Sequence, residues 1–516
     1  MMVNILGALQ EQRITTLYAI ATAFVFGIFL VVYEGVRWAV RIPRFKGPYG
    51  PPIVGNLWQI YGKDAPLQYR DWSRKYGPVY QIQLGNNPVL VINTAAAAKT
   101  LLTQNSHATA SRPEFYTFHK IISKGAALTI GASPYSDSLK KRRKIFASAL
   151  NRPSVASYVP HIDSETRILL KDALELGKAG KEQVNPIPLF LRMNVSLGFT
   201  LHWGARVESQ TDMFREIIYV ENAISNFRST TSNLQDHIPL LRLNPFNGVS
   251  AVARDMSVRR GRYMGQMDRE LDERLEKGSY KPCIRANVKL DPDGKLTDHE
   301  LTSLNVTMTA AGLDTMQATV SWGLAILAMK PEIQEKALSE IAKKFPQGAP
   351  LCEASDEFTV EYIMALIKEI ARHYPATRLS LPRKTMQDIF YQGKRIPKGT
   401  TLFLNAWACN MDPDLWEDPE VFRPERWLEH PETTNYTFGV GSRMCIGIHM
   451  ANRELYLLFI RLINSFKIVA DEPIDTNPIT GVNNPMATVS IPKPFKVRFV
   501  PRNLSALEAA LGVAKT

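Results

Sequence analysis

The chain has 516 residues, of which 45% are apolar and 22% are charged, the ordinary proportions of a globular protein. Length alone suggests about three domains, and one large domain around a buried cofactor is equally compatible with it. The net charge of +13 suits an anionic membrane surface or an acidic partner protein. No long Lys/Arg run with interleaved aromatics occurs, so nucleic acid is not an expected partner.

The four cysteines are widely spaced and include no CxxC pair: Cys283, Cys352, Cys409 and Cys445. This spacing argues against a disulfide framework and against a zinc site, and it suits a reducing compartment.

An apolar run without charges extends over residues 17–33, and with its flanks it reaches the length of about 20 residues that spans a bilayer as a helix. Basic residues lie mainly after the run: Arg13 precedes it, whereas Arg37, Arg41, Arg44 and Lys46 follow it. The positive-inside rule therefore makes residues 1–16 lumenal and the remainder cytosolic. The alternative is a cleaved signal peptide, but no small-residue cleavage site follows and the basic cluster lies on the wrong side. We expect an uncleaved single-pass anchor.

Residues 34–56 are basic and then rich in proline and glycine, with the sequence GPYGPPIVGN over residues 47–56. Proline fixes φ and removes an amide donor, so within this hinge residues 47–56 are predicted to be a stiff, non-helical spacer. Two β-rich runs, residues 78–84 and 88–92, then flank Gly85-Asn86-Asn87 and predict a hairpin.

Residues 135–144 read YSDSLKKRRK, and five consecutive basic side chains cannot all be buried, so we expect a solvated helix surface. Residues 151–276 are mostly helical by pattern, with interruptions at prolines.

A long helix is predicted over residues 301–329, with Asp314 as its one charged residue and too many polar side chains for a second membrane span. Ala311 and Gly312 would let a planar ligand press against the backbone, while Asp314 and Thr315 could open the helix to water. A buried polar residue in a core helix is the alternative. Further on, Glu369 and Arg372 lie three residues apart and can pair on one helix face, although an exposed pair of this kind contributes little.

The most specific stretch is Phe438-Gly-Val-Gly-Ser-Arg-Met-Cys-Ile-Gly447, which places Cys445 between glycines, two residues after Arg443. A thiolate that binds haem iron needs this setting, because glycines allow close backbone approach and the arginine can neutralise a propionate. A thiolate ligand also favours O–O bond cleavage. A buried structural thiol beside a glycine turn is the alternative, and the fixed offsets of Phe438, Gly441, Arg443 and Gly447 favour the haem site.

This stretch resembles the haem-binding signature of the cytochrome P-450 monooxygenases, FxxGxRxCxG, at every specified position. Residues 311–315 resemble the oxygen-activation motif of that family, residues 369–372 its ExxR motif, and residues 424–427 (PERW) the segment that supplies a second arginine. The resemblance extends from about residue 47 to residue 499. It implies a mainly α fold with smaller β-sheets, a haem-thiolate monooxygenase domain over residues 57–516, and haem b with Cys445 as its iron ligand.

The resemblance also implies roles for individual residues. Thr315 would hydrogen-bond oxygen during its activation, and Asp314 would relay protons. Phe438, Gly441 and Gly447 would shape the haem loop, and three arginines would contact haem propionates: Arg143, Arg383 and Arg443. Glu369, Arg372 and Arg426 would form a buried structural network. The family usually carries Trp-x-x-x-Arg in the basic helix, where this chain has Leu139 and keeps Arg143.

Within the family, several stretches are similar to fungal phenylacetate hydroxylases and hydroxylases of small phenols: residues 112–120, 134–140, 151–155 and 451–456. They imply hydroxylation of a cresol, a hydroxybenzyl alcohol or a phenylacetate, in aromatic catabolism or aromatic polyketide metabolism. Electrons would come from NADPH through a separate NADPH-cytochrome reductase, with cytochrome b5 as a second candidate donor, because no nucleotide-binding GxGxxG context is present. The expected location is the endoplasmic-reticulum membrane, with membrane lipid and O2 as further partners.

By position, the substrate pocket would include Phe115, Phe118, His119, Ala311 and Arg378. A buried polar group of the substrate needs a partner, and His119 or Arg378 could supply a donor. The alternatives are a surface residue and, for Arg378, another propionate contact.

Two other classes of function stay open from the sequence: a reductase-independent haem-thiolate isomerase or dehydratase, and a membrane-tethered haem sensor. The Asp314-Thr315 pair speaks against both, since neither needs a proton relay. Ring and benzylic hydroxylation are not distinguished.

Overall fold

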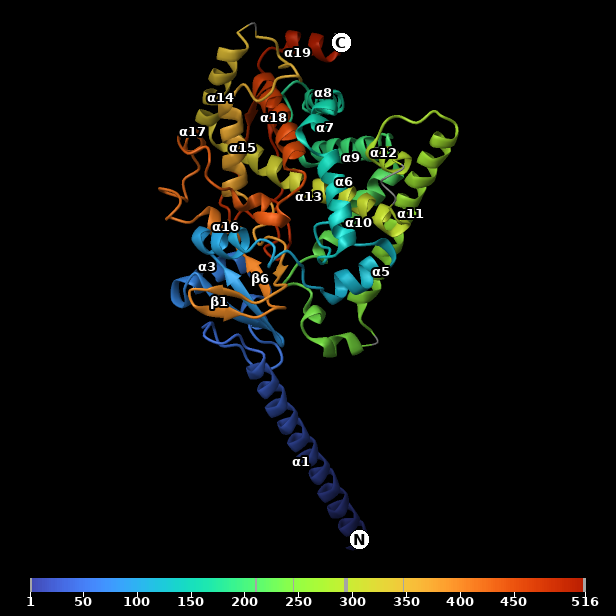
Figure 1. Cartoon of the computed structure of the whole chain (residues 1–516), viewed down its shortest axis with the longest axis vertical. Helices are drawn as coiled ribbons and strands as arrows, with labels where there is room; N and C mark the ends of the chain where they lie inside the picture. Colours follow the sequence, from blue (N-terminus) through green and yellow to red (C-terminus); the bar gives the residue numbers. More distant parts are fainter. Residues whose placement is uncertain (1, 209–210, 245, 292–295, 347, 514–516) are drawn as a thin grey trace.

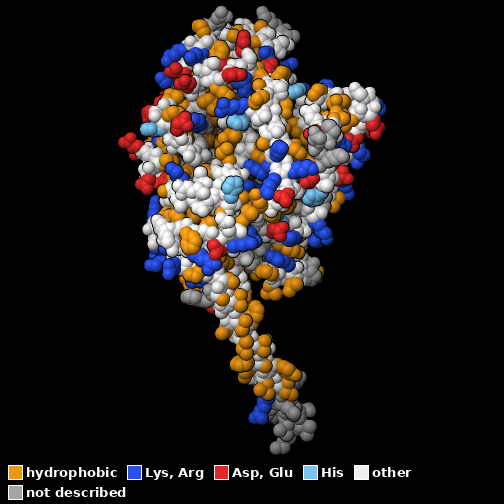
Figure 2. Space-filling view, viewed as in Figure 1, with side chains coloured by type: hydrophobic (Ala, Val, Ile, Leu, Met, Phe, Trp, Pro, Cys, Tyr) orange, Lys and Arg blue, Asp and Glu red, His pale blue; other side chains and the backbone are white. Residues whose placement is uncertain are grey.

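The computed structural model describes residues 2–208, 211–244, 246–291, 296–346 and 348–513. Helix α1 (Met2–Ala39) projects alone from one end of a mainly helical body (Figure 1). Its segment Arg13–Val36 has a mean hydropathy of 2.2 and its most apolar part is not buried against the body. Figure 2 shows a stalk covered by hydrophobic side chains below a body of mixed charge. The apolar helix is long enough to cross a bilayer and starts before the predicted residues 17–33.

The segment after α1, predicted as a hinge, packs against strand β1 (Val79–Leu84). Ile42 and Phe45 are buried, and the Gln81 side chain accepts from Ile42 N at 3.1 Å and donates to Ile42 O at 3.1 Å. The backbone N–H of Gln81 also donates to Lys46 O at 3.0 Å. The sheet therefore fixes the residues that lead out of α1.

Strand β1 pairs antiparallel with β2 (Asn87–Ile92), which confirms the predicted hairpin. Strand β6 (Thr401–Leu404) lies parallel to β2, and β3 (Arg383–Lys384) completes the order β1-β2-β6-β3. Two smaller pairs are antiparallel: β4 (Ile389–Tyr391) with β5 (Lys394–Ile396), and β7 (Phe466–Val469) with β8 (Arg498–Pro501). The sheets are small, as expected.

Helices make up most of the body; α3 (Ala65–Tyr76) and α16 (Ala406–Asn410) lie beside the four-stranded sheet, whereas most of the others lie farther from it (Figure 1). Besides α1, the structure has α2 (Leu57–Ile60), α3 (Ala65–Tyr76), α4 (Ala95–Ala98), η1 (Lys99–Gln104), η2 (Tyr116–Ile122), α5 (Ser123–Ala126), α6 (Asp137–Ala149), α7 (Arg152–Ser157), α8 (Val159–Leu176), α9 (Ile187–Trp203), α10 (Asp212–Asn226), η3 (Leu234–Asp236), η4 (Pro239–Leu243), α11 (Gly248–Glu276), α12 (Ile284–Leu290), α13 (Asp298–Met329), α14 (Pro331–Lys344), α15 (Glu361–His373), α16 (Ala406–Asn410), α17 (Arg426–Glu429), η5 (Tyr436–Phe438), η6 (Gly441–Arg443), α18 (Ile448–Ser465) and α19 (Leu504–Leu511).

Helix α13 runs through the middle of the body, with α9 packed along it (Figure 1). It begins at Asp298 rather than at the predicted residue 301, because Thr297 and Glu300 form a reciprocal capping box. Most of its side chains are buried on every side, which explains why its sequence resembles a membrane span.

Helix α18 follows the cysteine loop and contains a buried carboxyl, Glu454. Its Oε1 atom has no hydrogen-bond partner among the described residues, and burial raises the pKa of Glu454 to about 8. The folded protein therefore holds this side chain protonated at neutral pH, whereas the unfolded chain ionises it near pH 4.5.

We predict that Glu454→Gln removes a pH-dependent loss of stability. The protonated carboxyl contributes its full stability below about pH 4.5 and loses it as the pH rises to about 8. Between pH 5 and 8, the free energy of unfolding of the wild type should fall relative to that of the variant by about 4 kcal/mol. Urea denaturation of the full-length protein in detergent, followed by circular dichroism, measures the difference. The exposed Glu472→Gln is the control; parallel pH profiles for wild type and Glu454→Gln would contradict the prediction.

Candidate active site

The cysteine loop joins η5 to α18 and turns sharply at two glycines. Gly439 has φ +68° and Gly441 has φ +64°, a region that favours glycine. The Cys445 amide donates to Phe438 O at 2.9 Å and closes the loop. These contacts place Phe438 and Cys445, seven residues apart in sequence, next to each other.

Gly441 is also required by the close approach of η1. A Cβ at this position would lie 2.4 Å from the Leu102 carbonyl oxygen and 2.8 Å from Ser106 Oγ. The Ser442 amide donates to Ser106 Oγ at 2.6 Å and fixes the loop against that segment. Any side chain at position 441 would therefore clash with η1 and the segment that follows it, so the packing requires glycine there.

Cys445 is surrounded by protein, yet its side chain is exposed, so the sulfur borders an internal space instead of packing against neighbours. Burial raises the pKa of the thiol, while the Gly447 amide and the Arg143 guanidinium act in the opposite direction. The other three cysteines are buried. Of the four, only Cys445 presents its sulfur to a ligand.

The middle of α13 also has exposed residues in an otherwise buried surrounding. Ala311 and Gly312 are exposed although the helix around them is buried, and a Cβ added at Gly312 would meet nothing within 4 Å. The Thr315 hydroxyl donates to Ala311 O at 2.7 Å, a back-bond that loosens a helix turn. Beside it, burial raises the pKa of Asp314 to about 6, with the Ser225 hydroxyl and Arg228 lowering it, and the Asp314 Oδ1 atom has no partner in the described part of the chain.

Four arginines gather around the cysteine loop: Arg112, Arg143, Arg383 and Arg443. Burial, together with the charges of Arg143 and Arg383, lowers the pKa of Arg443 to about 9. Burial likewise lowers the pKa of Arg383 to about 10. Such mutual repulsion leaves a surplus of positive charge at this place, which favours an anionic ligand.

The four guanidinium groups are held mainly by backbone carbonyls. Arg443 donates to Ala110 O at 2.6 Å and to three further carbonyls, and Arg383 donates to Val440 O. Arg143 donates to Met444 O at 3.3 Å. Arg383 Nη1 and Arg443 Nε stay without a partner within the described residues. Arg112 was not predicted from the sequence, because nothing local marks its charge as part of this cluster.

These features together fit a haem. The accessible Cys445 thiol would bind its iron, the exposed Ala311-Gly312 face would leave room for a flat ring, and the unpartnered guanidinium donors would bind its propionates. The structure thus brings Arg143, Arg383, Arg443 and Cys445 together around one place.

The ExxR residues are buried and bonded to one another. Arg372 Nε and Nη2 both donate to Glu369 at 2.8 Å, and Arg426 Nε donates to Glu369 Oε1 at 3.2 Å. Trp427 Nε1 adds a bond to Glu369 Oε2 at 3.0 Å. All three charged side chains are at most 1% exposed. This is a closed network with no access to a substrate.

Three of the five predicted pocket residues, Phe115, Phe118 and His119, lie in or just before η2, a π-helical turn of the kind often found at functional sites. Both ring nitrogens of His119 face backbone groups: Nδ1 accepts from Phe115 N at 3.0 Å and Nε2 lies 3.3 Å from Ala132 O. The Phe118 ring packs edge-on against His119 at 5.3 Å. Both ring nitrogens of His119 are therefore engaged by backbone groups of the protein and not directed to a substrate.

Two arginines approach the same region. Arg378 forms an ion pair with Asp64 at 2.5 Å and is 5% exposed. Arg228, which the sequence did not single out, places its guanidinium 5.3 Å from the centre of the Phe118 ring.

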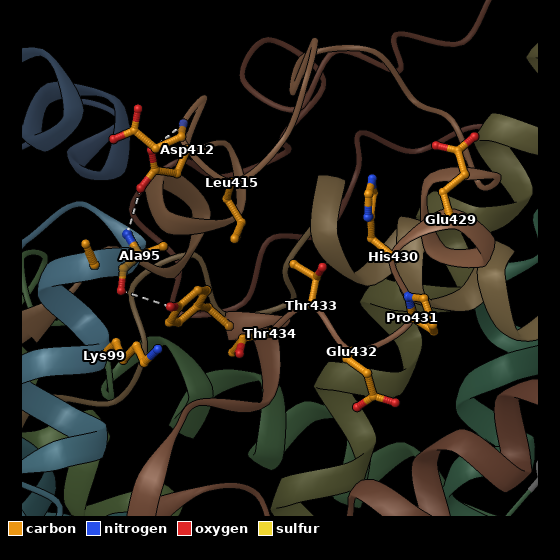
Figure 3. A pocket seen from close by; sticks show the side chains of 13 residues that line it. Ala95, Lys99, Asp412, Leu415, Glu429, His430, Pro431, Glu432, Thr433 and Thr434 are labelled. Atoms are coloured by element: carbon orange, nitrogen blue, oxygen red, sulfur yellow. Dashed lines mark hydrogen bonds between the residues drawn. The ribbon is translucent and has the colours of Figure 1, made fainter.

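A separate hollow of about 670 Å³ opens on the surface between α4 and the chain before η5 (Figure 3). Its lining includes Lys99, His430 and four carboxylates, of which Asp412 accepts a hydrogen bond from Ala95 N at 2.7 Å (Figure 3). Apolar side chains complete the lining, and the hollow includes none of the motif residues.

Comparison with known proteins matches residues 45–499 of this chain to the family described as Cytochrome P450. A "3-hydroxyphenylacetate 6-hydroxylase" of Emericella nidulans is 53% identical, with 97% of each chain covered. A "Phenylacetate 2-hydroxylase" of the same organism is 39% identical (92% of this chain, 94% of the relative), and a "Cytochrome P450 monooxygenase CYP3" of Mycosarcoma maydis is 38% identical (90% and 88%). With the fold and the cysteine loop in agreement, this chain belongs to the cytochrome P450 family and is a monooxygenase with a haem-thiolate cofactor.

Proposed function

We propose that the protein hydroxylates a small hydroxylated or unsubstituted phenylacetate, with 3-hydroxyphenylacetate as the first candidate. The observation that carries this proposal is the 53% identity over nearly the whole chain to a relative named for that reaction. A second relative, named for phenylacetate, points to the same class of substrate. The reaction serves aromatic catabolism, with aromatic polyketide metabolism as the other setting. Cresols and hydroxybenzyl alcohols are the neutral alternatives.

The cofactor is haem b, held by Cys445 at the iron and by arginines at the propionates. Bound there, the haem supplies the oxidising power that inserts one atom of O2 into a C–H bond. Arg143, Arg383 and Arg443 neutralise the propionates, and Arg112 adds a fourth positive charge. Gly441 and Gly447 keep the loop close enough for the sulfur to reach the metal.

Asp314 and Thr315 handle protons on the other side of the site. Thr315 can release its bond to Ala311 O and turn its hydroxyl into the space beside Ala311 and Gly312. Asp314, with a pKa of about 6 and an unpartnered oxygen, changes protonation near neutral pH and can pass protons from solvent. Ala311 leaves room for the substrate ring.

The enzyme is anchored in the endoplasmic-reticulum membrane by α1, with the body in the cytosol. Exposed apolar residues on η4 and just after it support this placement, since they lie at the end of the body from which α1 projects (Figure 1): Leu240, Leu241, Leu243 and Phe246. Electrons come from an NADPH-cytochrome reductase, with cytochrome b5 as a second donor. The exposed lysines of α6, Lys140, Lys141 and Lys144, offer a basic surface to an acidic partner.

The substrate proposal is tested by turnover of the full-length protein with purified reductase and NADPH. We expect 3-hydroxyphenylacetate to give a ring-hydroxylated product, with lower kcat/KM for m-cresol and 3-hydroxybenzyl alcohol. Product analysis by chromatography and mass spectrometry is the measurement, with omission of reductase as the control. Turnover of the neutral compounds alone would overturn the arylacetate assignment and leave a hydroxylase of small phenols. Turnover without reductase would favour an isomerase or dehydratase.

The proton-handling role predicts that Thr315→Ala consumes NADPH but loses most of it to peroxide or water. Product formed per NADPH should fall about 10-fold, the lower range for losing a group that assists proton transfer. Thr319→Ala is a matched control, because Thr319 lies one turn further along α13 and makes the same kind of bond, to Thr315 O at 3.0 Å. Equal coupling in wild type and Thr315→Ala would remove Thr315 from the relay.

A further inference from the structure

Arg228 lies just after the end of α10, where the chain turns back towards the centre of the molecule. Its guanidinium stands over the Phe118 ring. It also lines a narrow cavity of about 30 Å³ together with the segments 378–382 and 485–488. That volume has room for a small polar group, but not for a whole aromatic ring.

Arg228 is half-buried and has no carboxylate partner of its own. Its Nε atom has no hydrogen-bond partner among the described residues, and the guanidinium forms no ion pair with a described carboxylate. Burial lowers the pKa of Arg228, and the charge of Arg260 lowers it further. An unpaired charge that has lost much of its water costs free energy that the fold could avoid with an apolar residue.

The nearest acidic side chains do not account for this charge. Glu221 is taken by Arg260, whose Nε donates to Glu221 Oε1 at 2.8 Å and whose Nη2 donates to the other oxygen. The Tyr263 hydroxyl donates to Glu221 as well. Asp314 is close enough to favour the charged form of Arg228, but it forms no ion pair or hydrogen bond with the guanidinium among the described residues. Arg228 therefore keeps guanidinium donors that no described carboxylate takes up.

Arg378 lines the same cavity and differs in this respect. Its Nη1 atom is paired with Asp64 Oδ2, and its Nη2 lies 3.5 Å from Pro485 O. A substrate carboxylate would have to displace Asp64 to bind there, whereas Arg228 presents free donors.

We propose that Arg228 is the specificity-determining residue that binds the carboxylate of an arylacetate substrate, an inference that rests on the proposed function. A guanidinium binds a carboxylate through two parallel hydrogen bonds, which fixes the direction of the molecule as well as its affinity. The narrow cavity receives the carboxylate, and Phe118 packs beside the group that links it to the ring. The ring then extends towards Asp314 and the exposed face of α13.

The test compares 3-hydroxyphenylacetate with m-cresol, because the two differ only by the carboxylate. Dissociation constants of both are measured on the full-length holoprotein from the absorbance change of the haem, for wild type, Arg228→Leu, Arg228→Lys and Arg378→Leu. Wild type should prefer the acid. In Arg228→Leu the preference should fall about 10- to 100-fold, the loss of a charge-assisted hydrogen-bond pair, while m-cresol binding stays within about threefold. Arg228→Lys should keep part of the preference, and Arg378→Leu should keep nearly all of it.

Each contrary result overturns the inference in a different way. An unchanged preference in Arg228→Leu removes Arg228 and leaves the proposed function intact, as does a preference lost in Arg378→Leu instead. If Arg228→Leu keeps the preference but uncouples NADPH use with m-cresol, Arg228 serves Asp314 and not the substrate. A wild type without preference for the acid refutes the arylacetate proposal itself. If Arg228→Leu does not bind haem, Arg228→Gln replaces it under the same criteria.

Discussion

The buried pairing of Glu369 with Arg372 and Arg426 is the interaction on which the cysteine loop depends. Removing these charges from water is costly, and their mutual hydrogen bonds offset that cost only in this one geometry. Helix α15, which carries the ExxR pair, also holds the stem of the loop: Asn435 Nδ2 donates to Lys368 O at 3.0 Å and the Thr437 hydroxyl donates to Ala371 O. The network thus acts on the sulfur of Cys445 through the backbone that leads to it.

Charge differs between two places in the molecule. Arginines gather around the cysteine loop, whereas carboxylates line the surface hollow between α4 and the chain before η5. Four arginines surround the loop: Arg112, Arg143, Arg383 and Arg443. Arg228 adds a further positive charge near Asp314 of α13. By contrast, the hollow beside η5 is lined by carboxylates (Figure 3). The arginines around the loop therefore favour an anionic group of a ligand in the interior.

The sequence was informative where function depends on residues close together in the chain. The spacing of Phe438, Gly441 and Cys445 reflects one turn of backbone, and Glu369 with Arg372 reflects one turn of helix, so both could be predicted without a fold. The structure also confirms the predicted hairpin at Gly85 and the predicted long helix, α13. Helix α13 begins three residues before its predicted start, because the capping box of Thr297 and Glu300 stabilises an additional part of its first turn.

Residues that act through tertiary burial could not be found in this way. Arg112 and Arg228 look like ordinary surface arginines in the sequence. Only the packing of distant segments buries Arg112 among backbone carbonyls and leaves Arg228 without a carboxylate partner. The same packing pairs Arg378 with Asp64, more than 300 residues away in the chain, and so changes its expected role. A polar side chain's neighbours, not its type, decide whether it is free to bind a ligand.

The central claim is that the Cys445 thiolate binds the haem iron, and the carbon monoxide spectrum of the reduced protein tests it most directly. Wild type should show a thiolate-type Soret band, and Cys445→Ala should lose that band, while Cys409→Ala, at a buried cysteine, should keep it. A thiolate-type band that persists in Cys445→Ala would contradict the account.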